Sequence, residues 1–433
     1  MRRPTGARAS GQGITAIAVE GFKSIAARQR IDVRPLTLLA GANSSGKSSM
    51  MQPLLLLKQT LHSDYDPGGL LLDGANVRFT KADQILSRIG RRRSRFSVQL
   101  ELEPPFSVAA TYRHGSGSTA FVVESTAVTD RVGPMTARAG MSPTEIRAEL
   151  GERLHGAVDD ADLEVTAASL PLPGPFLALW EGTRESSGVL AYLHGNEAIN
   201  IATEHLRDLI HVPAWRGDAK RSYPVTAVDG RFPGTFDRYV ASLIAEWRRR
   251  SDQRHQLIER DLATLGLASE LSVKALDETQ LEVLVGRLAT PRGRGSDLVN
   301  LADVGFGVSQ CLPVVVAMLT AAPGRLVYIE EPEIHLHPRA QVALAELAVR
   351  AAKRRVRLVL ETHSSLLLRG IQTAVARKEI AADQVALHWF ERSDSGATHV
   401  RTAELADDGS FGDWPVDFDD VTLAAERDYL DAS

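Results

Sequence analysis

The sequence is poor in cysteine and contains no long apolar run. Cys311 is the single cysteine among 433 residues, which excludes a disulfide framework within the chain and a metal site built from several cysteines. No apolar run is long enough to cross a bilayer, and the N-terminus, with Arg2 and Arg3, lacks the hydrophobic block of a secretion signal. We therefore expect a cytoplasmic protein without membrane contact.

An excess of one charge sign is also absent. The chain has 50 Lys and Arg residues against 54 Asp and Glu residues, a net charge of −4, so no overall field draws it to nucleic acid or to a membrane. Basic runs at 91–93, 248–250 and 353–355 offer local contacts to phosphate backbones. Such runs are more often hydrated faces.

The most informative motif is a glycine- and serine-rich loop at Gly41–Ser49. An apolar strand, Leu36–Ala40, precedes it and a helical segment, Met50–Leu57, follows it, which is the setting of a phosphate-binding P-loop. We expect Lys47 to reach the terminal phosphates of a nucleotide and the Ser48 hydroxyl to bind Mg²⁺. The predicted cofactor-binding residues of this loop are Gly41, Asn43, Ser44, Ser45, Gly46, Lys47, Ser48 and Ser49.

Two adjacent acids end a second apolar strand, Leu326–Glu331. In a parallel α/β sheet the ligand site lies beyond the carboxyl ends of the strands, so this strand end and the P-loop should face the same crevice. Neighbouring strand residues point to opposite sides. We therefore expect Glu330 to support the metal ion and Glu331 to activate a water molecule as general base. The competing interpretation is a solvated acidic loop.

A histidine follows a third apolar strand, in the segment Arg357–Ser364. Imidazole can donate to a phosphate oxygen or orient the attacking water, which makes His363 a candidate sensor of the nucleotide state. A strand-end histidine is more often structural when it stands alone, but the two other motifs favour the functional interpretation.

A second glycine-rich turn, Asp303–Gln310, opens the apolar segment Cys311–Leu319 and makes a further anion-binding helix end. One chain cannot readily direct two such ends at one phosphate. A symmetric dimer can instead offer Gly305, Gly307 and Ser309 to the nucleotide of the partner. The alternative is a plain N-terminal cap of the helix.

The predicted fold class is α/β, and the length allows two to three structural units. We expect a disordered tail at 1–12, half of the fold at 13–135 with an antiparallel β layer, a mainly helical insertion at 136–270 that forms a lid or arm, and the other half at 271–433. In this last part strands and helices alternate around a parallel sheet. The insertion includes a long amphipathic helical stretch, Phe236–Leu265.

The order of these motifs resembles the ABC-type ATPases of the SMC, RecF and OLD-like group, and in particular the AAA-family ATPases found beside bacterial defence effectors. The matching segments are GFKSI at Gly21–Ile25, GANSSGKSS at Gly41–Ser49, DVGFGVSQ at Asp303–Gln310, YIEEPEIHLHP at Tyr328–Pro338 and ETHS at Glu361–Ser364, with softer similarity at His211–Arg216 and Asp413–Phe418. The resemblance implies an ABC-type P-loop NTPase head that binds ATP and Mg²⁺ and pairs with a second head, each signature loop completing the other's nucleotide site.

By this resemblance Lys47, Glu331 and His363 act in catalysis, while Ser48 and Glu330 serve the metal. Two departures from the family pattern leave questions open. The signature GFGVSQ lacks the usual serine two residues before a glycine, so either Gly305 or Ser309 must take that role. The family's glutamine ligand of the metal has only a weak candidate, Gln84.

These features predict a Mg²⁺-dependent ATPase that acts as a homodimeric or higher-order nucleotide switch. Its partner would be a separate effector protein, a nuclease or toxin, in bacterial antiphage defence. The alternatives are a RecF-like DNA-binding ATPase of repair and an OLD-like ATPase with nuclease activity. The candidate nuclease metal cluster is Glu330, Glu331, Glu333, His335 and His337, with an acidic tail at 417–420.

Overall fold

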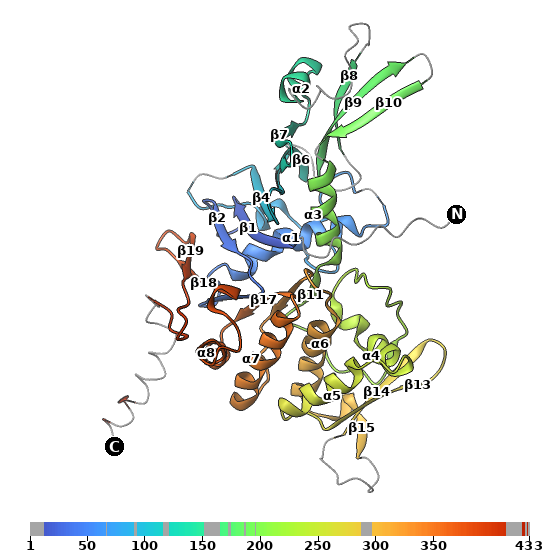
Figure 1. Ribbon diagram of the computed structural model, residues 1–433, viewed down its shortest axis with the longest axis vertical. Coiled ribbons are helices and arrows are strands. Elements are labelled where there is room, and N and C mark those ends of the chain that lie inside the picture. The colour runs from blue at the N-terminus through green and yellow to red at the C-terminus, as the bar shows by residue number, and fades with distance from the viewer. Residues whose placement is uncertain are drawn as a thin grey trace. The chain divides into compact units, whose positions relative to one another are not determined.

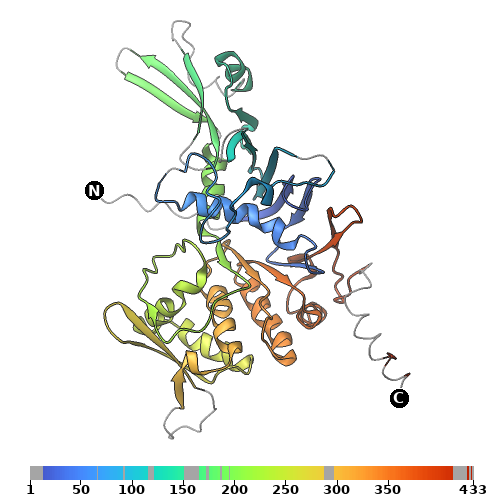
Figure 2. The ribbon, with the colours of Figure 1, turned by 180° about the vertical axis from the view of Figure 1, so that it is seen from behind.

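The computed structural model describes residues 13–65, 67–90, 93–115, 121–150, 165–171, 175–185, 188–194, 196–286 and 297–412, with Arg427, Asp428 and Asp431. Figures 1 and 2 show the elements from opposite sides. Two compact units are interleaved along the chain, one from the described residues of 1–32, 48–207 and 392–399 and the other from those of 33–47, 208–391 and 400–433. The units thus alternate along the sequence and are not separated at residues 135 and 270.

The first unit contains a six-stranded antiparallel sheet with the order β2-β1-β4-β5-β6-β7. Buried and less buried residues alternate along β4 and β5, because successive side chains of a strand point to opposite faces. The antiparallel β layer predicted from the sequence is confirmed. Its strands are β1 (Ile14–Glu20), β2 (Gln29–Asp32), β4 (Arg95–Leu102), β5 (Ser107–His114), β6 (Phe121–Asp130) and β7 (Gly133–Arg138).

A three-stranded antiparallel sheet, β10-β9-β8, lies in the region for which helices were predicted. These strands contain few β-branched residues, which are the usual indicator of a strand, so local sequence does not predict them. The remaining elements of this part of the chain are α1 (Lys47–Leu61), η1 (Ala82–Gln84), α2 (Pro143–Leu150), β8 (Val165–Pro171), β9 (Leu177–Glu185), β10 (Gly188–His194) and α3 (Asn196–Asp208).

The second unit is built on a six-stranded sheet with the order β11-β16-β17-β3-β18-β19, in which β11, β16, β17, β3 and β18 pair in parallel. These strands are almost continuously apolar and buried, as is typical of parallel sheets. The predicted α/β class with a parallel sheet is confirmed. The strands are β3 (Leu36–Gly41), β11 (Ile210–Val212), β16 (Leu326–Glu330), β17 (Arg357–Thr362), β18 (Val385–Arg392) and β19 (Thr398–Ala403).

Helices pack with this sheet into one continuous hydrophobic core. Helices α6 and α7 run side by side in both views (Figures 1 and 2), and α7 also packs against α8. The helices are η3 (Phe236–Tyr239), α4 (Val240–Arg249), α5 (Arg254–Thr264), η4 (Leu301–Asp303), α6 (Phe306–Thr320), α7 (Pro338–Lys353), α8 (Ser365–Ala376) and η5 (Ala382–Gln384). A smaller sheet joins β12 (Tyr223–Pro224), β13 (Glu270–Ala275), β14 (Gln280–Gly286) and β15 (Leu298–Asn300). Among the described residues no helix is both long and apolar enough to cross a membrane.

The long helical stretch predicted for Phe236–Leu265 is interrupted in the structure. Helix α4 ends in a left-handed residue, Ser251, with φ 52°. The Ser251 N–H donates to the Arg248 carbonyl over 3.2 Å and the Asp252 N–H donates to the Trp247 carbonyl over 2.8 Å. This pair of bonds is a Schellman termination, so the chain turns before α5 begins at Arg254.

Candidate functional site

The P-loop connects β3 to α1 and has a backbone that requires glycine at its start. Gly41 adopts φ 141°, and a Cβ atom there would lie 2.3 Å from the carbonyl oxygen of Phe390 on the neighbouring strand β18. Ser44 and Gly46 follow with φ values of 61° and 109°. These left-handed positions make the chain curl into the concave loop that a polyphosphate needs.

The predicted phosphate-binding residues lie in this loop with different exposures. Asn43 and Ser44 are exposed and Ser45 is buried, while Ser48 and Ser49 are half-buried in the first turn of α1. A helix N-terminus that follows such a loop favours anions. The contact of each residue with a phosphate or a metal ion stays a prediction.

Lys47 is buried, with 3% of its surface exposed, and its ammonium group points back into the loop. Its Nζ donates to the carbonyl oxygens of Gly41 and Ala42, each over 3.0 Å. Burial lowers the pKa of Lys47, and three nearby carboxylates oppose that shift. The carboxylates belong to Glu361, Glu331 and Glu333. The loop lysine therefore lies within an acidic cluster at the carboxyl edge of the sheet.

Glu330 is the last residue of β16, and both of its carboxylate oxygens are engaged. His211 Nε2 donates to Oε1 over 3.1 Å, and the Ala214 N–H donates to Oε2 over 3.2 Å. Burial alone would raise the pKa of Glu330, but the hydrogen bond and charge of His211, with the Ala214 N–H, bring it below its usual value. Glu330 is therefore an ionised carboxylate with a fixed orientation.

Glu331 does not continue the strand, as the sequence analysis had assumed. Its backbone is left-handed, with φ 43°. Its N–H donates to the Glu361 carbonyl over 2.8 Å, and its own carbonyl accepts from Arg216 Nη2 over 3.1 Å. The direction of the Glu331 side chain is thus set by a turn that is hydrogen-bonded on both sides.

Two further acids, which the sequence analysis did not assign to the ATPase site, complete the cluster. Glu361, at the end of β17, accepts a hydrogen bond from the Tyr328 hydroxyl over 2.6 Å. Glu333 accepts from Thr362 Oγ1 and from the His363 N–H, each over 2.7 Å. Burial raises the pKa of Glu333, although these two bonds oppose the shift. Glu333 follows closely after Glu330 and Glu331 in the sequence, where it is a candidate only for the alternative nuclease metal cluster.

His363 follows β17 directly and lies next to the N-cap of α8, Ser364. Burial lowers its pKa, the positive charge of Lys47 lowers it further, and Glu331 opposes both effects. At neutral pH the imidazole is therefore uncharged. These electrostatic interactions also show that His363, Lys47 and Glu331 are neighbours.

Strand pairing explains why these distant residues meet. Strands β16, β17 and β3 are parallel neighbours, with Glu330 opposite Glu361 and Thr362 opposite Ala40. Their carboxyl ends consequently share one edge of the sheet. The structure brings Lys47, Glu330, Glu331 and His363 together at this edge; their individual roles stay predictions.

The segment Asp303–Gln310, called the signature loop here, lies at the start of α6 and contacts the segment that follows β16. The rings of Phe306 and His335 lie 5.8 Å apart between centroids. Gly305 is exposed, and a Cβ atom there would meet nothing within 4 Å in the described part of the chain. Ser309 is half-buried, and its hydroxyl donates to the Phe306 carbonyl over 3.1 Å. The Ser309 hydroxyl is thus engaged within the loop, while the space around Gly305 is open.

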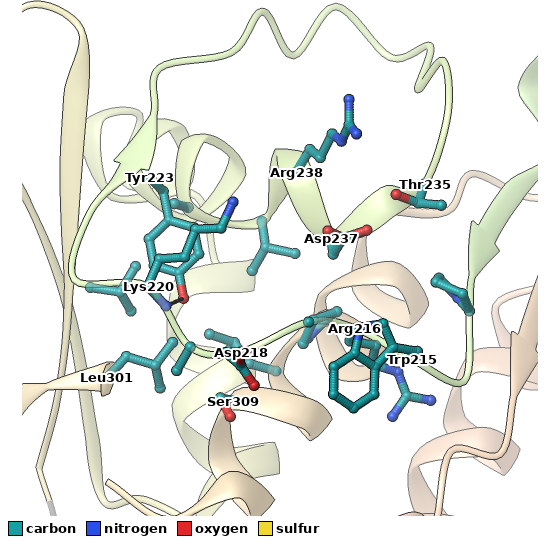
Figure 3. Close-up of a pocket in the computed structure, with 18 of the residues that line it drawn as sticks. Trp215, Arg216, Asp218, Lys220, Tyr223, Thr235, Asp237, Arg238, Leu301 and Ser309 are labelled. Atoms are coloured by element: carbon teal, nitrogen blue, oxygen red, sulfur yellow. Dashed lines mark hydrogen bonds between the residues drawn. The ribbon is translucent and has the colours of Figure 1, made fainter. Parts of the chain in front are cut away.

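A cavity of about 470 Å³ lies beside helix α6, the helix that follows the signature loop, and Ser309 forms part of its wall (Figure 3). The wall combines apolar residues, including Leu301, with the polar residues Lys220 and Asp237. Trp215, which is 75% exposed, also lines it. The chain segment that carries Trp215 and Arg216 therefore lines this cavity and, through Arg216, also bonds to the end of β16.

The residues at the edge fit a magnesium ion held mainly by nucleotide phosphates. Magnesium usually takes only one or two ligands from the protein, with the rest from phosphate and water. Glu330 offers an ionised, oriented carboxylate, and Ser48 stands in the first turn of α1. No group of three or more histidine, cysteine or acidic residues among those described could hold a metal by itself.

The nuclease cluster considered above is not formed in the described part of the chain. His337 is the N-cap of α7, where its Nδ1 accepts from the Arg339 N–H. His335 pairs with Phe306. The acidic tail at 417–420 lies outside the described residues.

The proposed glutamine ligand of the metal is engaged elsewhere. The side-chain oxygen of Gln84 accepts from the Thr80 N–H over 2.7 Å and from the Lys81 N–H over 3.3 Å. Gln84 therefore closes a local turn in the first unit. The glutamine ligand stays unassigned.

Comparison with known proteins finds a similarity to an AAA-domain family in part of the chain. Residues 188–369 match the model of the family described as "AAA domain, putative AbiEii toxin, Type IV TA system". This segment includes Glu330, Glu331 and His363, amounts to less than half of the chain, and begins after the P-loop. No significant match was found among curated proteins.

Several solved SMC head domains are similar to the chain at low sequence identity. "Crystal structure of the SmcHead bound to the C-winged helix domain of ScpA" has 13% identity and a TM-score of 0.45, covering 91% of this chain and 98% of that chain. "SMC head domain from Thermotoga maritima" has 12% identity and a TM-score of 0.37, covering 91% and 100%. An Smc head with an extended coiled coil, bound to the C-terminal domain of ScpA derived from Pyrococcus furiosus, has 11% identity and a TM-score of 0.42, covering 90% and 96%.

Proposed function

We propose that the protein is a magnesium-dependent ATPase that works as a dimeric nucleotide switch. One observation carries the proposal: a glycine-rich strand–loop–helix presents Lys47 at the same sheet edge as Glu331 and His363. The match of residues 188–369 to an AAA domain supports it. A phosphate cradle, an ionised acid and a neutral imidazole are the groups that phosphoryl transfer to water requires.

The proposed roles follow from the present hydrogen bonds. Ser48 and Glu330 would hold Mg²⁺, which would supply positive charge to neutralise the nucleotide phosphates. Lys47 would exchange the carbonyls of Gly41 and Ala42 for the terminal phosphates. Glu331 would accept the proton of the attacking water. His363, whose pKa is lowered, would hydrogen-bond to the γ-phosphate without adding charge.

The signature loop supports a head-to-head dimer as the working form. Gly305 is exposed, and no neighbouring atom of the described chain requires glycine there. Phe306 is 57% exposed at the start of α6. An exposed glycine and aromatic residue at a helix N-terminus suit contact with a nucleotide and with the facing subunit.

The partner that best suits such a switch is a separate effector, a nuclease or toxin, in bacterial antiphage defence. The family that matches residues 188–369 is itself described as a putative toxin of a Type IV toxin–antitoxin system, which supports a role for this chain in such a system and names no separate effector. Detection of a small nuclease or toxin gene beside this gene would support a separate effector, and replication or repair genes would favour the DNA-repair alternative.

The basic runs give little support to DNA binding by this chain alone. Arg249 and Arg250 both pair with Glu246, at 2.7 Å and 2.5 Å. Arg248 donates to Ser272 Oγ, and Arg354 donates to the Met318 carbonyl. These cations are already engaged within the chain. Salt-sensitive binding of the purified protein to DNA ends or gaps would reverse this preference.

The test is ATP binding and phosphate release by the purified full-length protein. The Lys47→Ala variant should lose ATP binding, because the buried ammonium group at the phosphate cradle is removed. Lys378→Ala is a matched control, since Lys378 also donates to a main-chain carbonyl, that of Asp407, but is exposed and has no place in the proposed site. Wild-type protein that neither binds nor hydrolyses ATP would refute the proposal.

A further inference from the structure

Arg216 stands out as a buried cation bonded only to main-chain carbonyls in the contacts that the structure shows. It is 7% exposed. Its Nη2 donates to the carbonyl oxygens of Glu330 over 2.6 Å and Glu331 over 3.1 Å, and its Nη1 donates to that of Gln310 over 3.3 Å. One guanidinium group therefore joins the end of β16 to the signature helix α6.

Burial lowers the pKa of Arg216, and the charges around it only oppose that shift. A desolvated cation held by carbonyl dipoles is a costly arrangement, so a stabilising role alone is a weak explanation. Its position suggests a more specific role, because it binds the peptide units on both sides of the left-handed turn at Glu331.

We propose that Arg216 is the positioning residue of Glu331, and that it links the orientation of this acid to the signature helix. The inference rests on the function proposed above. A left-handed non-glycine residue persists only when its surroundings fix it. At Glu331 they do so through the Glu361 carbonyl on one side and Arg216 on the other.

Two hydrogen bonds link the segment that carries Arg216 to helix α6. Arg216 donates to the Gln310 carbonyl, and the Gln310 side chain donates back to the Gly217 carbonyl over 2.8 Å. Gln310 lies only one turn after the signature residue Phe306. A displacement of the signature loop would therefore move the segment that orients Glu331. The same segment lines the cavity beside α6, where Figure 3 shows Arg216 and Trp215 as neighbours along it.

The test compares Arg216→Ala with wild type in steady-state ATPase assays and in equilibrium ATP binding. We expect kcat to fall about 100-fold, the effect of a roughly 1 Å misplacement of a catalytic group, while the Kd for ATP stays within about two-fold. Arg354→Ala is the matched control, because Arg354 donates to the Met318 carbonyl at the opposite end of the same helix. Its kcat should equal that of wild type.

A double variant separates positioning from general damage. If Arg216 acts through Glu331, adding Arg216→Ala to Glu331→Gln should lower kcat no further, because the group that it orients is already inactive. Full additivity, or loss of ATP binding in Arg216→Ala, would overturn the inference. So would wild-type kcat in that variant.

Two measurements keep the test valid if Arg216→Ala is unstable. Arg216→Lys keeps the charge but cannot reach two carbonyls with a planar fork, so its kcat should fall while ATP binding remains. Added guanidinium ion should restore part of the turnover of Arg216→Ala and none of that of Glu331→Gln. Absence of both effects would refute the positioning role. If wild type itself lacks ATPase activity, the proposed function fails instead, and the two failures are thereby distinguished.

Discussion

Replacement of Glu331 by Gln should stop ATP turnover while leaving ATP binding intact. General-base catalysis contributes a factor of about 10² to 10⁴, so the barrier should rise by about 2.7 to 5.4 kcal/mol. Gln has nearly the same shape as Glu and keeps both main-chain bonds of the turn, to Glu361 and from Arg216. Stability should therefore change by no more than about 0.5 kcal/mol.

Charge decides the expected effect on binding. Glu331 is one of three carboxylates around Lys47, and Glu333 and Glu361 remain in the variant. Removing a negative charge beside the polyphosphate site favours an anionic ligand, so the Kd for ATP should be equal to or lower than that of wild type. With hydrolysis blocked, ATP should also trap a dimer that elutes earlier in size-exclusion chromatography.

The assay is phosphate release at saturating ATP and Mg²⁺, together with equilibrium binding of ATP. Glu278→Gln is a matched control, because Glu278 is an exposed glutamate in the turn between β13 and β14. Turnover in Glu331→Gln equal to that of wild type would remove Glu331 from the role of base. Loss of ATP binding would show instead that the acid belongs to the binding site.

Three other perturbations test separate parts of the site. Burial raises the pKa of Glu333 above 4.5, so the folded state binds the carboxyl proton more tightly than the unfolded chain does, and the free energy of unfolding should fall as pH rises above that value. Denaturant unfolding between pH 4 and 7 should show a weaker loss of stability with rising pH for Glu333→Gln than for wild type. Equal pH dependence of the two proteins would contradict this prediction. The free energy of unfolding of Gly305→Ala should lie within about 1 kcal/mol of the wild-type value, since the added Cβ meets no atom within 4 Å. The same variant should show less ATP-dependent dimer formation and lower turnover. Normal turnover would exclude Gly305 from the nucleotide site of the partner subunit. A chelator should abolish hydrolysis without shifting the unfolding temperature of the nucleotide-free protein, as the described residues contain no self-sufficient metal cluster, and a marked drop in Tm would indicate a structural metal.

The strands and loops around the phosphate site were predictable because their signals are local. A run of a few hydrophobic residues such as Leu36–Ala40 is enough to predict a buried strand, and a glycine-rich turn before a helix is enough to predict an anion site. The assignment of Glu331 to a strand was wrong by one residue, because a glutamate in the left-handed conformation gives no sequence signal of the kind that a glycine gives. Helix α4 likewise ends at a Schellman turn centred on a serine, where glycine would have been the signal.

The long-range hydrogen bonds that orient Glu330 and Glu331 were not predictable from the sequence. The His211–Glu330 bond joins residues 119 positions apart, and Arg216 reaches Glu331 across 115 positions. Nothing near His211 or Arg216 in the sequence identifies these partners. The softer motif similarity at His211–Arg216 marked the segment without indicating its purpose.

The amino-acid sequence by itself determined that the chain contains a phosphate loop, two acids after one buried strand and a histidine after another, because each motif is encoded within about ten residues. Only the tertiary structure decided that Glu333 supports His363, that His211 keeps Glu330 ionised and that Arg216 fixes the turn at Glu331. The physical reason is that strand order and burial place these groups together, and neither their hydrogen bonds nor their pKa shifts exist until the parallel sheet has formed.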